Sequence, residues 1–174
     1  RSVILYGCNT FLALHWADVS GADAASGNIV LSIFFAAGAL ATLLGGYIAD
    51  RWGLRRCIII GFTTLPFLLA ALAYLCSAVA TALLVVPLGV ALSMVYSPIV
   101  VSGQRYLPNH VGLSSGVTLG LAVSVGGVTA PLLGMVADRW GLDWVFATLA
   151  ATALIPAALS WILPEMPRPA HSGK

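Results

Sequence analysis

Charged side chains are scarce in this chain. Asp, Glu, Lys and Arg together make up only 8% of its 174 residues, whereas 60% of the residues are hydrophobic. A soluble globular domain carries roughly 25% charged residues. A fold of this length could not cover a water-exposed surface with so few charges, so we expect lipid as its solvent. The net charge of +2 is too small to indicate a nucleic-acid partner.

Residue clusters that carry chemistry are also missing. The cysteines Cys8, Cys57 and Cys76 are scattered within apolar runs and fit neither a metal spacing nor a disulfide framework. The sequence has no glycine-rich phosphate loop with a lysine and no cluster of His and Cys, so we expect no metal and no other cofactor. No Asp or Glu falls at the centre of an apolar run. A proton-coupling carboxylate is therefore expected in a part of the protein outside this sequence.

Long apolar runs dominate what remains. A transmembrane helix needs about 20 mostly apolar residues. Six candidate spans lie at 2–17, 27–49, 57–77, 80–102, 113–136 and 144–163. The sequence therefore predicts an all-α membrane protein, with a six-helix bundle over 1–163 and a cytoplasmic tail over 164–174.

The basic residues are distributed unevenly between the predicted loops. If Arg1 lies in the cytoplasm and the spans alternate, seven of the eight Lys and Arg residues are cytoplasmic and only Arg139 is outside. Cytoplasmic loops carry an excess of basic residues, so we expect both ends of the chain in the cytoplasm. The sequence begins without Met, and its first span is short, which indicates a piece of a longer protein. A free-standing six-helix protein that homodimerises into a transporter or channel stays open as the alternative.

One motif occurs twice. The pattern Gly-x-x-Ala-Asp-Arg-Trp-Gly-Leu begins at Gly46 and again, 88 residues later, at Gly134. The first copy follows the second span and the other copy follows the fifth, so the predicted topology places them on opposite sides of the membrane. Repeats of inverted topology are typical of secondary transporters. We therefore predict an inverted 3+3 repeat, whose second copy contains Gly134, Asp138, Arg139 and Gly141.

The first copy and its flanks, GGYIADRWGLRR, resemble the loop signature of the major facilitator superfamily, G-x-x-x-D-R-x-G-R-[RK]. The matching residues are Gly46, Asp50, Arg51, Gly53, Arg55 and Arg56, and Leu54 departs from the usual spacing. The resemblance implies a conformational latch in which Asp50 accepts charge-assisted hydrogen bonds from a neighbouring helix end. The arginines would anchor the loop at the anionic inner leaflet. Topological anchoring alone is the alternative.

A second segment, 103–127, resembles the loop between helices ten and eleven of fosmidomycin-resistance-type facilitators. The run 107–109 (Leu-Pro-Asn) and the run 112–116 (Gly-Leu-Ser-Ser-Gly) carry this resemblance. It implies the C-terminal half of a bacterial inner-membrane antiporter for small molecules or drugs, driven by protons, with an N-terminal six-helix bundle as its partner. A loose match to the family's Gly/Pro-rich antiporter motif comprises Gly120, Gly126, Gly127 and Pro131. Close helix packing and a kink are the structural alternative for these four.

Polar residues inside the spans are candidates for lining a substrate cavity, because burying them in lipid is costly. They are Tyr6, Asn9, Thr10, Asn28, Ser32 and Tyr96. His15 changes its charge near neutral pH and either binds a proton or anchors a helix end beside Trp16. Ser114 lies in a G-x-S-x-G pattern, which would suggest an intramembrane hydrolase. That pattern needs a strand–turn–helix context, so we favour a helix cap and expect no enzymatic activity.

Overall fold

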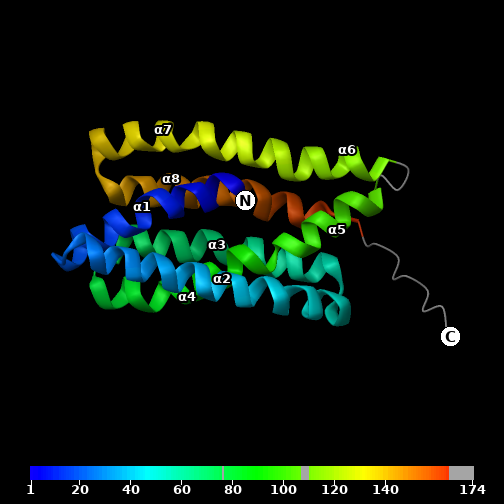
Figure 1. The fold of residues 1–174 in the computed structure, drawn as a ribbon, viewed down its shortest axis with the longest axis horizontal. Helices are drawn as coiled ribbons and strands as arrows, with labels where there is room; N and C mark the ends of the chain where they lie inside the picture. Colours follow the sequence, from blue (N-terminus) through cyan, green and yellow to red (C-terminus); the bar gives the residue numbers. More distant parts are fainter. Residues whose placement is uncertain (76, 107–109, 165–174) are drawn as a thin grey trace.

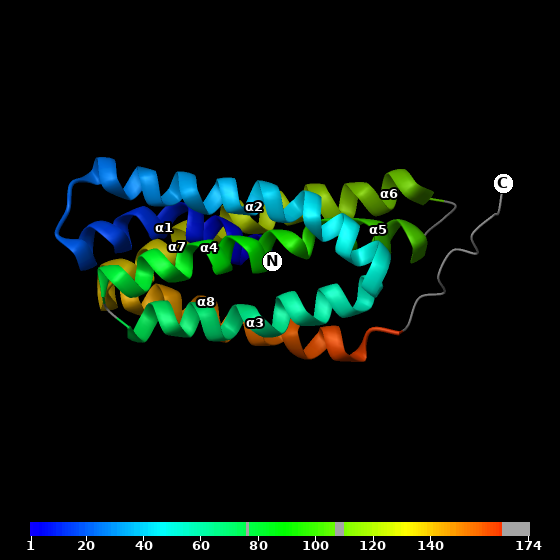
Figure 2. The same cartoon turned by 90° about the horizontal axis from the view of Figure 1, so that it is seen from below.

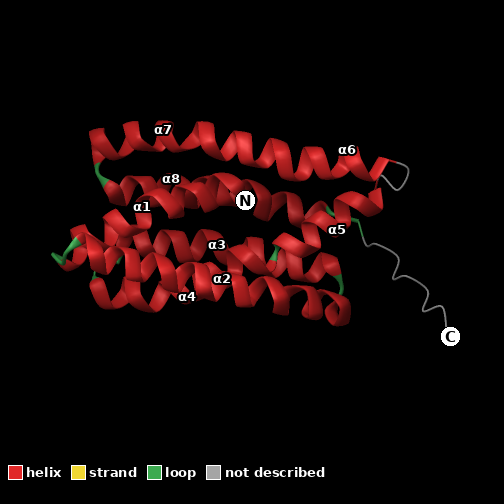
Figure 3. Ribbon diagram, in the orientation of Figure 1, coloured by secondary structure: helices red, strands yellow, loops and turns green. Residues whose placement is uncertain are grey.

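The computed structural model describes residues 1–75, 77–106 and 110–164, and all regular structure in this part of the chain is helical (Figures 1 and 3). The helices are α1 (Ser2–Ser20), α2 (Ala24–Trp52), α3 (Leu54–Tyr74), α4 (Ala78–Met94), α5 (Tyr96–Tyr106), α6 (Val111–Ser115), the π-helix η2 (Gly116–Leu121), α7 (Ala122–Trp140) and α8 (Leu142–Ile162). They lie side by side along the long axis of the molecule (Figures 1 and 2). The predicted all-α class is confirmed.

Five segments of the described chain are long and apolar enough to cross a membrane. They are Ala25–Trp52, Leu54–Tyr74, Ala78–Tyr106, Gly112–Trp140 and Leu142–Ile162. Helix α1 forms where the first span was predicted, but it is not among the five. Asn9, His15 and Asp18 make it less apolar than the others. The predicted tail lies outside the described residues apart from its first residue, Pro164.

Two of these segments are interrupted helices. Helix α4 ends at Met94 and α5 begins at Tyr96, so the helix is interrupted at Val95. Pro98 has no N–H to donate to the carbonyl of Met94, and its ring crowds that carbonyl, which explains a break at this point. In the next segment the π-helix η2 separates α6 from α7. Helix α7 continues through Pro131, and the kink at that residue stays a prediction.

The most extensive helix contacts join α3 to α8 and α2 to α4, and those of α1 with α7 and of α3 with α4 come next. Small residues allow the close approach of α2 and α4. A Cβ on Gly45 would lie 2.7 Å from the carbonyl oxygen of Met94, and one on Gly89 would lie 2.6 Å from that of Phe34. In lipid no hydrophobic force drives helices together, so backbone contact of this kind supplies the packing.

These contacts follow a regular scheme. Let α1 correspond to α4, α2 to α7 and α3 to α8. The contact of α2 with α4 then corresponds to that of α7 with α1, and the contact of α3 with α4 to that of α8 with α1. All four contacts exist. The same correspondence relates the turn between α2 and α3 to the turn between α7 and α8. These two turns lie at opposite ends of the bundle (Figures 1 and 2).

The core is shared by α1, α3, α4 and α8, and on α3 and α8 side chains such as Leu65, Leu69, Phe146 and Leu149 are fully buried. Large apolar side chains also cover the outside of the bundle, for example Leu43, which is 76% exposed. An exposed apolar surface of this extent is a liability in water. It suits a lipid-facing surface, as the composition predicts.

Candidate functional site

The two motif copies fold into the same helix–turn–helix. Gly53 ends α2 with φ 93°, and Gly141 ends α7 with φ 92°. Each glycine N–H donates to the carbonyl of the alanine four residues earlier, Ala49 or Ala137, at 2.9 Å. Because only glycine adopts this backbone conformation without strain, each copy stops one helix and starts the next within one residue.

The charges of the first copy lie on helix ends rather than in a loop. Arg51 places its guanidinium 4.8 Å from the ring centre of Tyr47. Arg55 Nη2 donates to the Trp161 carbonyl at 3.1 Å, so it joins the start of α3 to the end of α8. Asp50 is exposed and has no recorded hydrogen bond or ion pair with the described residues. The contact between helices therefore comes from Arg55, and the latch role predicted for Asp50 and Arg51 stays a prediction.

Charge is segregated between the two ends of the bundle. Among the described residues, the end with the α1–α2 and α7–α8 turns carries Asp18, Asp23, Asp138, Arg139 and Asp143. The opposite end, with the α2–α3 turn and the end of α5, carries Asp50, Arg51, Arg55, Arg56 and Arg105. One end of the bundle thus carries four carboxylates and one arginine, and the opposite end carries four arginines and one carboxylate.

A cavity of about 730 Å³ lies between α1, α5, η2 and the start of α7, with Phe62 of α3 among its lining residues. Two of the predicted cavity residues, Tyr6 and Tyr96, line it. The other four do not. Asn9 and Thr10 lie on the exposed surface of α1, and so do Asn28 and Ser32 on α2.

Arg1 also lines this cavity, and the side of the membrane on which this end of the chain lies stays a prediction. The start of α1 lies part way along the bundle rather than at the end that carries the α2–α3 turn (Figures 1 and 2). Arg1 Nε donates to the Leu92 carbonyl at 3.1 Å, and its guanidinium lies 4.5 Å from the ring centre of Tyr96. These partners are more than 90 positions away in the sequence, so no local pattern could have revealed them.

The glycines of α7 and η2 divide into two groups. Gly126 is buried, and a Cβ there would overlap the ring of Tyr6, so that ring sits directly on the α7 backbone. Gly120 and Gly127 are exposed, and a Cβ on either would meet nothing within 4 Å. Of the four residues in the proposed antiporter motif, Gly126 is thus the one against which a cavity-lining side chain, that of Tyr6, packs. The π-helix next to it is a feature that often occurs at functional sites.

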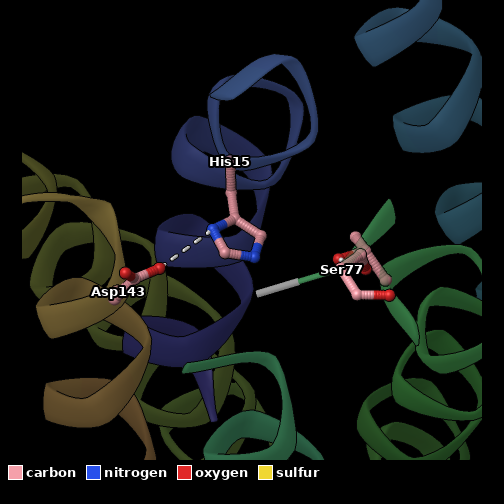
Figure 4. Close-up of polar contacts among 4 residues, drawn as sticks. His15, Ser77 and Asp143 are labelled. Atoms are coloured by element: carbon pink, nitrogen blue, oxygen red, sulfur yellow. Dashed lines mark hydrogen bonds and ion pairs between the residues drawn. The ribbon is translucent and has the colours of Figure 1, made fainter. Parts of the chain in front are cut away.

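His15 is fully buried, and its role as a proton-binding group or as an anchor of a helix end stays a prediction. Its Nδ1 lies 3.7 Å from a carboxylate oxygen of Asp143, and its ring centre lies 4.8 Å from that of Phe146 (Figure 4). Neither ring nitrogen has a hydrogen-bond partner among the described residues. Trp16 does act as an anchor, since its Nε1 donates to Ser26 Oγ at 3.0 Å and ties α1 to the start of α2.

Ser114 lies in helical surroundings. It is buried in α6, and its carbonyl accepts a hydrogen bond from Thr118 Oγ1 at 2.7 Å. The G-x-S-x-G pattern therefore spans α6 and the first residue of η2 instead of a strand and a sharp turn. The run 107–109, which carries part of the family resemblance, lies outside the described residues.

The comparisons with known proteins agree with this all-helical membrane architecture. A sequence-family model described as Major Facilitator Superfamily matches residues 2–174. The chain is 34% identical over 166 residues to an uncharacterized MFS-type transporter, YfnC, of Bacillus subtilis (strain 168). The matched region covers 90% of this chain and 37% of that protein. It is 33% identical over 147 residues to the fosmidomycin resistance protein of Escherichia coli (strain K12). This match covers 83% of this chain and 35% of that protein.

Fold and family match together define an all-helical membrane domain. The chain belongs to the Major Facilitator Superfamily. It spans a little over a third of the length of the curated relatives that it matches.

Proposed function

We propose that this chain is the C-terminal six-helix half of a secondary active transporter that exports a small molecule from a bacterial cell by proton-coupled alternating access. The cavity between α1, α5 and η2 is the observation that carries this proposal. It lies between helices of both motif-bearing halves, α1–α3 and α4–α8. Transporters built from inverted repeats bind their substrates near the membrane midplane at such a junction.

The two motif turns at opposite ends of the bundle support the inverted 3+3 repeat. The corresponding contacts of α2 with α4 and of α7 with α1 support it as well. In this arrangement α1 is the sixth span despite its lower apolarity, and an N-terminal six-helix bundle of the same protein completes the cavity. The name of the Escherichia coli relative supports drug export as the direction of transport.

The arginine-rich end is placed in the cytoplasm, because positive charge is retained on that side of the inner membrane. The end of α8 is then cytoplasmic. Asp50 and Arg51 form the latch between this bundle and its partner bundle. The exposed position of Asp50 supports this role, since an acceptor that is free within its own bundle can bind donors on another.

Transport in everted inner-membrane vesicles tests the proposal. The whole open reading frame that contains this chain is expressed, and uptake of a drug panel is measured with and without a proton gradient. We expect gradient-dependent uptake that Asp50→Asn slows at unchanged protein level, whereas Asp138→Asn in the second copy serves as the matched control. Unchanged transport by Asp50→Asn would remove the latch. Gradient-dependent transport by a homodimer of this chain alone would favour the free-standing alternative.

A further inference from the structure

His15 is enclosed by this chain itself, within the last two turns of α1. Its ring is fully buried, so its surroundings come from these helices and not from a further part of the protein. Neither nitrogen has a hydrogen-bond partner among the described residues, and the ring packs against Phe146 of α8. Burying a polar group without a hydrogen bond is costly. Phenylalanine would fill the same space without that cost, so packing alone does not explain a histidine here.

Asp143 offers the ring a charged partner that is open to water. One carboxylate oxygen lies 3.7 Å from Nδ1, beyond hydrogen-bond distance, and the Asp143 side chain is 49% exposed (Figure 4). A protonated ring forms a charge-assisted hydrogen bond of about 2.7–2.9 Å only if it moves toward this carboxylate. A charged ring thus has a partner on the side of the water and none in its packed position.

The other charged groups at this end act little on the ring. Asp18, three residues further along α1, is the second carboxylate with an electrostatic effect on His15. Asp23, before α2, and Asp138 and Arg139 of α7 lie at the same end without a recorded interaction with the ring. Helix α4 carries no titratable side chain. The charges recorded as acting on His15 are therefore both negative.

The end of α1 is held differently on its two sides. Toward α2, Trp16 Nε1 donates to Ser26 Oγ at 3.0 Å, and a Cβ on Gly27 would lie 2.7 Å from the carbonyl oxygen of Ala13. Toward α8, the ring of His15 provides the contact at this level. A charge on the ring therefore weakens the contact of α1 with α8 and leaves α1 joined to α2.

We propose that His15 is a proton-operated switch at this end of the bundle. A proton from the aqueous phase binds the ring, the charged ring leaves Phe146 for Asp143, and the end of α1 separates from α8. Loss of the proton returns the ring to its packed position. In the transport cycle the switch lies on the outer side and opens that side when a proton binds. Its place in the cycle rests on the proposed function, whereas the switch itself rests on the contacts of the ring.

Hydrogen–deuterium exchange of the detergent-purified full-length protein tests the switch. Exchange is measured at about pH 8 and about pH 5, on either side of the ordinary histidine pKa of about 6.5. After correction for intrinsic rates, it gives opening constants for the end of α1, the start of α8 and the α2–α3 turn. A ring that is neutral when packed and titrates normally when released allows an increase of up to roughly thirtyfold. We expect about tenfold or more at the end of α1 and the start of α8, and none at the α2–α3 turn.

Substitutions assign this response to the two residues. His15→Phe fills the same space without a titratable group and should abolish the increase. The matched control is His110→Phe, which removes an exposed histidine just before α6 and should respond like the wild type. Asp143→Asn should reduce the increase, because the released ring loses its charged acceptor, whereas Asp138→Asn at the same end should not. Thermal unfolding at about pH 8 establishes that each variant is folded.

Several results would overturn the switch. They are equal opening of the wild type at both pH values, an acid response that persists in His15→Phe, a loss in His110→Phe that matches the loss in His15→Phe, and a response that is unchanged or enlarged in Asp143→Asn.

The proposed function fails separately, because exchange is measured without transport. An acid response that depends on His15, in a protein that transports no drug of the panel, keeps the switch and removes the transport role. Gradient-driven transport by His15→Phe at the wild-type rate at both pH values keeps the transporter and removes the switch from its cycle.

Discussion

Arg55 and Asp143 occupy equivalent positions in the two motif copies, and both act on the same helix. Arg55 donates to the carbonyl of Trp161 at the end of α8, and Asp143 lies in the first turn of α8, 3.7 Å from His15. A helix favours a positive charge at its C-terminus and a negative charge at its N-terminus. The two copies differ in charge at this position, and each sign stabilises the end of α8 that it meets.

Arg55→Gln should therefore destabilise the bundle by about 1 kcal/mol, because the carbonyl end of α8 loses a charged hydrogen-bond donor. Thermal unfolding in detergent should show a decrease of roughly 2–4 °C in Tm. Arg56→Gln is the matched control, since Arg56 is exposed and makes no recorded contact with the described residues. Equal decreases for the two variants would contradict the role given to Arg55.

Gly45→Ala should destabilise the contact between α2 and α4. A Cβ there would lie 2.7 Å from the Met94 carbonyl oxygen and 3.0 Å from its Cα, and backbone atoms cannot rotate away. Overpacking of this kind typically costs about 1–3 kcal/mol. Gly46→Ala is the control, because its Cβ would lie 3.7 Å from Ser97 Oγ, an ordinary contact. The amount of folded protein after solubilisation is the measurement, and a Gly45→Ala yield equal to that of Gly46→Ala would argue against close packing.

Gly53→Ala and Gly141→Ala should each weaken the turn that they form. Both glycines have φ values above 90°, where a side chain is strained by about 1–3 kcal/mol. We expect similar losses in Tm at the two turns, because their geometry is the same. Gly134→Ala controls for substitution of a glycine in the second copy, since a Cβ there meets nothing within 4 Å. If the two turn variants melted like Gly134→Ala, the strain argument would be wrong.

His15→Phe should preserve or increase stability. The ring is fully buried, and neither nitrogen has a hydrogen-bond partner among the described residues. Burying a polar group without a hydrogen bond is costly, so an apolar ring of similar shape removes that cost. The Asp143 carboxylate near His15 is exposed and can be hydrated when the imidazole is gone. His15→Ala should instead cost about 2–4 kcal/mol, because it opens a cavity beside Phe146. Thermal unfolding ranks the stability of the wild type, His15→Phe and His15→Ala. A Phe variant that unfolds at as low a temperature as the Ala variant would show that the imidazole itself is required for stability.

Each predicted apolar run coincides with helix in the structure, although two runs are interrupted helices and the first is not among the five candidate spans. The ends of the helices were predicted less well. The second predicted span ends at residue 49 and the fifth at 136, whereas α2 continues to Trp52 and α7 to Trp140. Charged residues end the apolar run without ending the helix, because Asp50 and Arg51 at a bundle end can remain helical in a polar environment. The true ends are at Gly53 and Gly141, where the positive φ value breaks the backbone hydrogen bonding.

The cavity shows why site residues were harder to predict. Polarity inside a span selected Tyr6 and Tyr96, which line the cavity of the structure, but it also selected Asn28 and Ser32, which lie on an exposed surface. Which side of a helix faces a cavity depends on its neighbours. For Arg1 those neighbours are on α4 and α5, about half the chain away. The π-helix had no sequence signal that the hydropathy pattern could register.

The unequal charge of the two bundle ends gives the molecule an electrical polarity. With the arginine-rich end in the cytoplasm, as proposed, the net positive end faces the negative side of an energised membrane. Carrying one elementary charge across a potential of 100 mV against the field costs about 2.3 kcal/mol. Turning the bundle over would move an excess of three positive charges outward and three negative charges inward. The membrane voltage therefore opposes reversal of the bundle and acts in the same direction as the rule that retains basic loops inside.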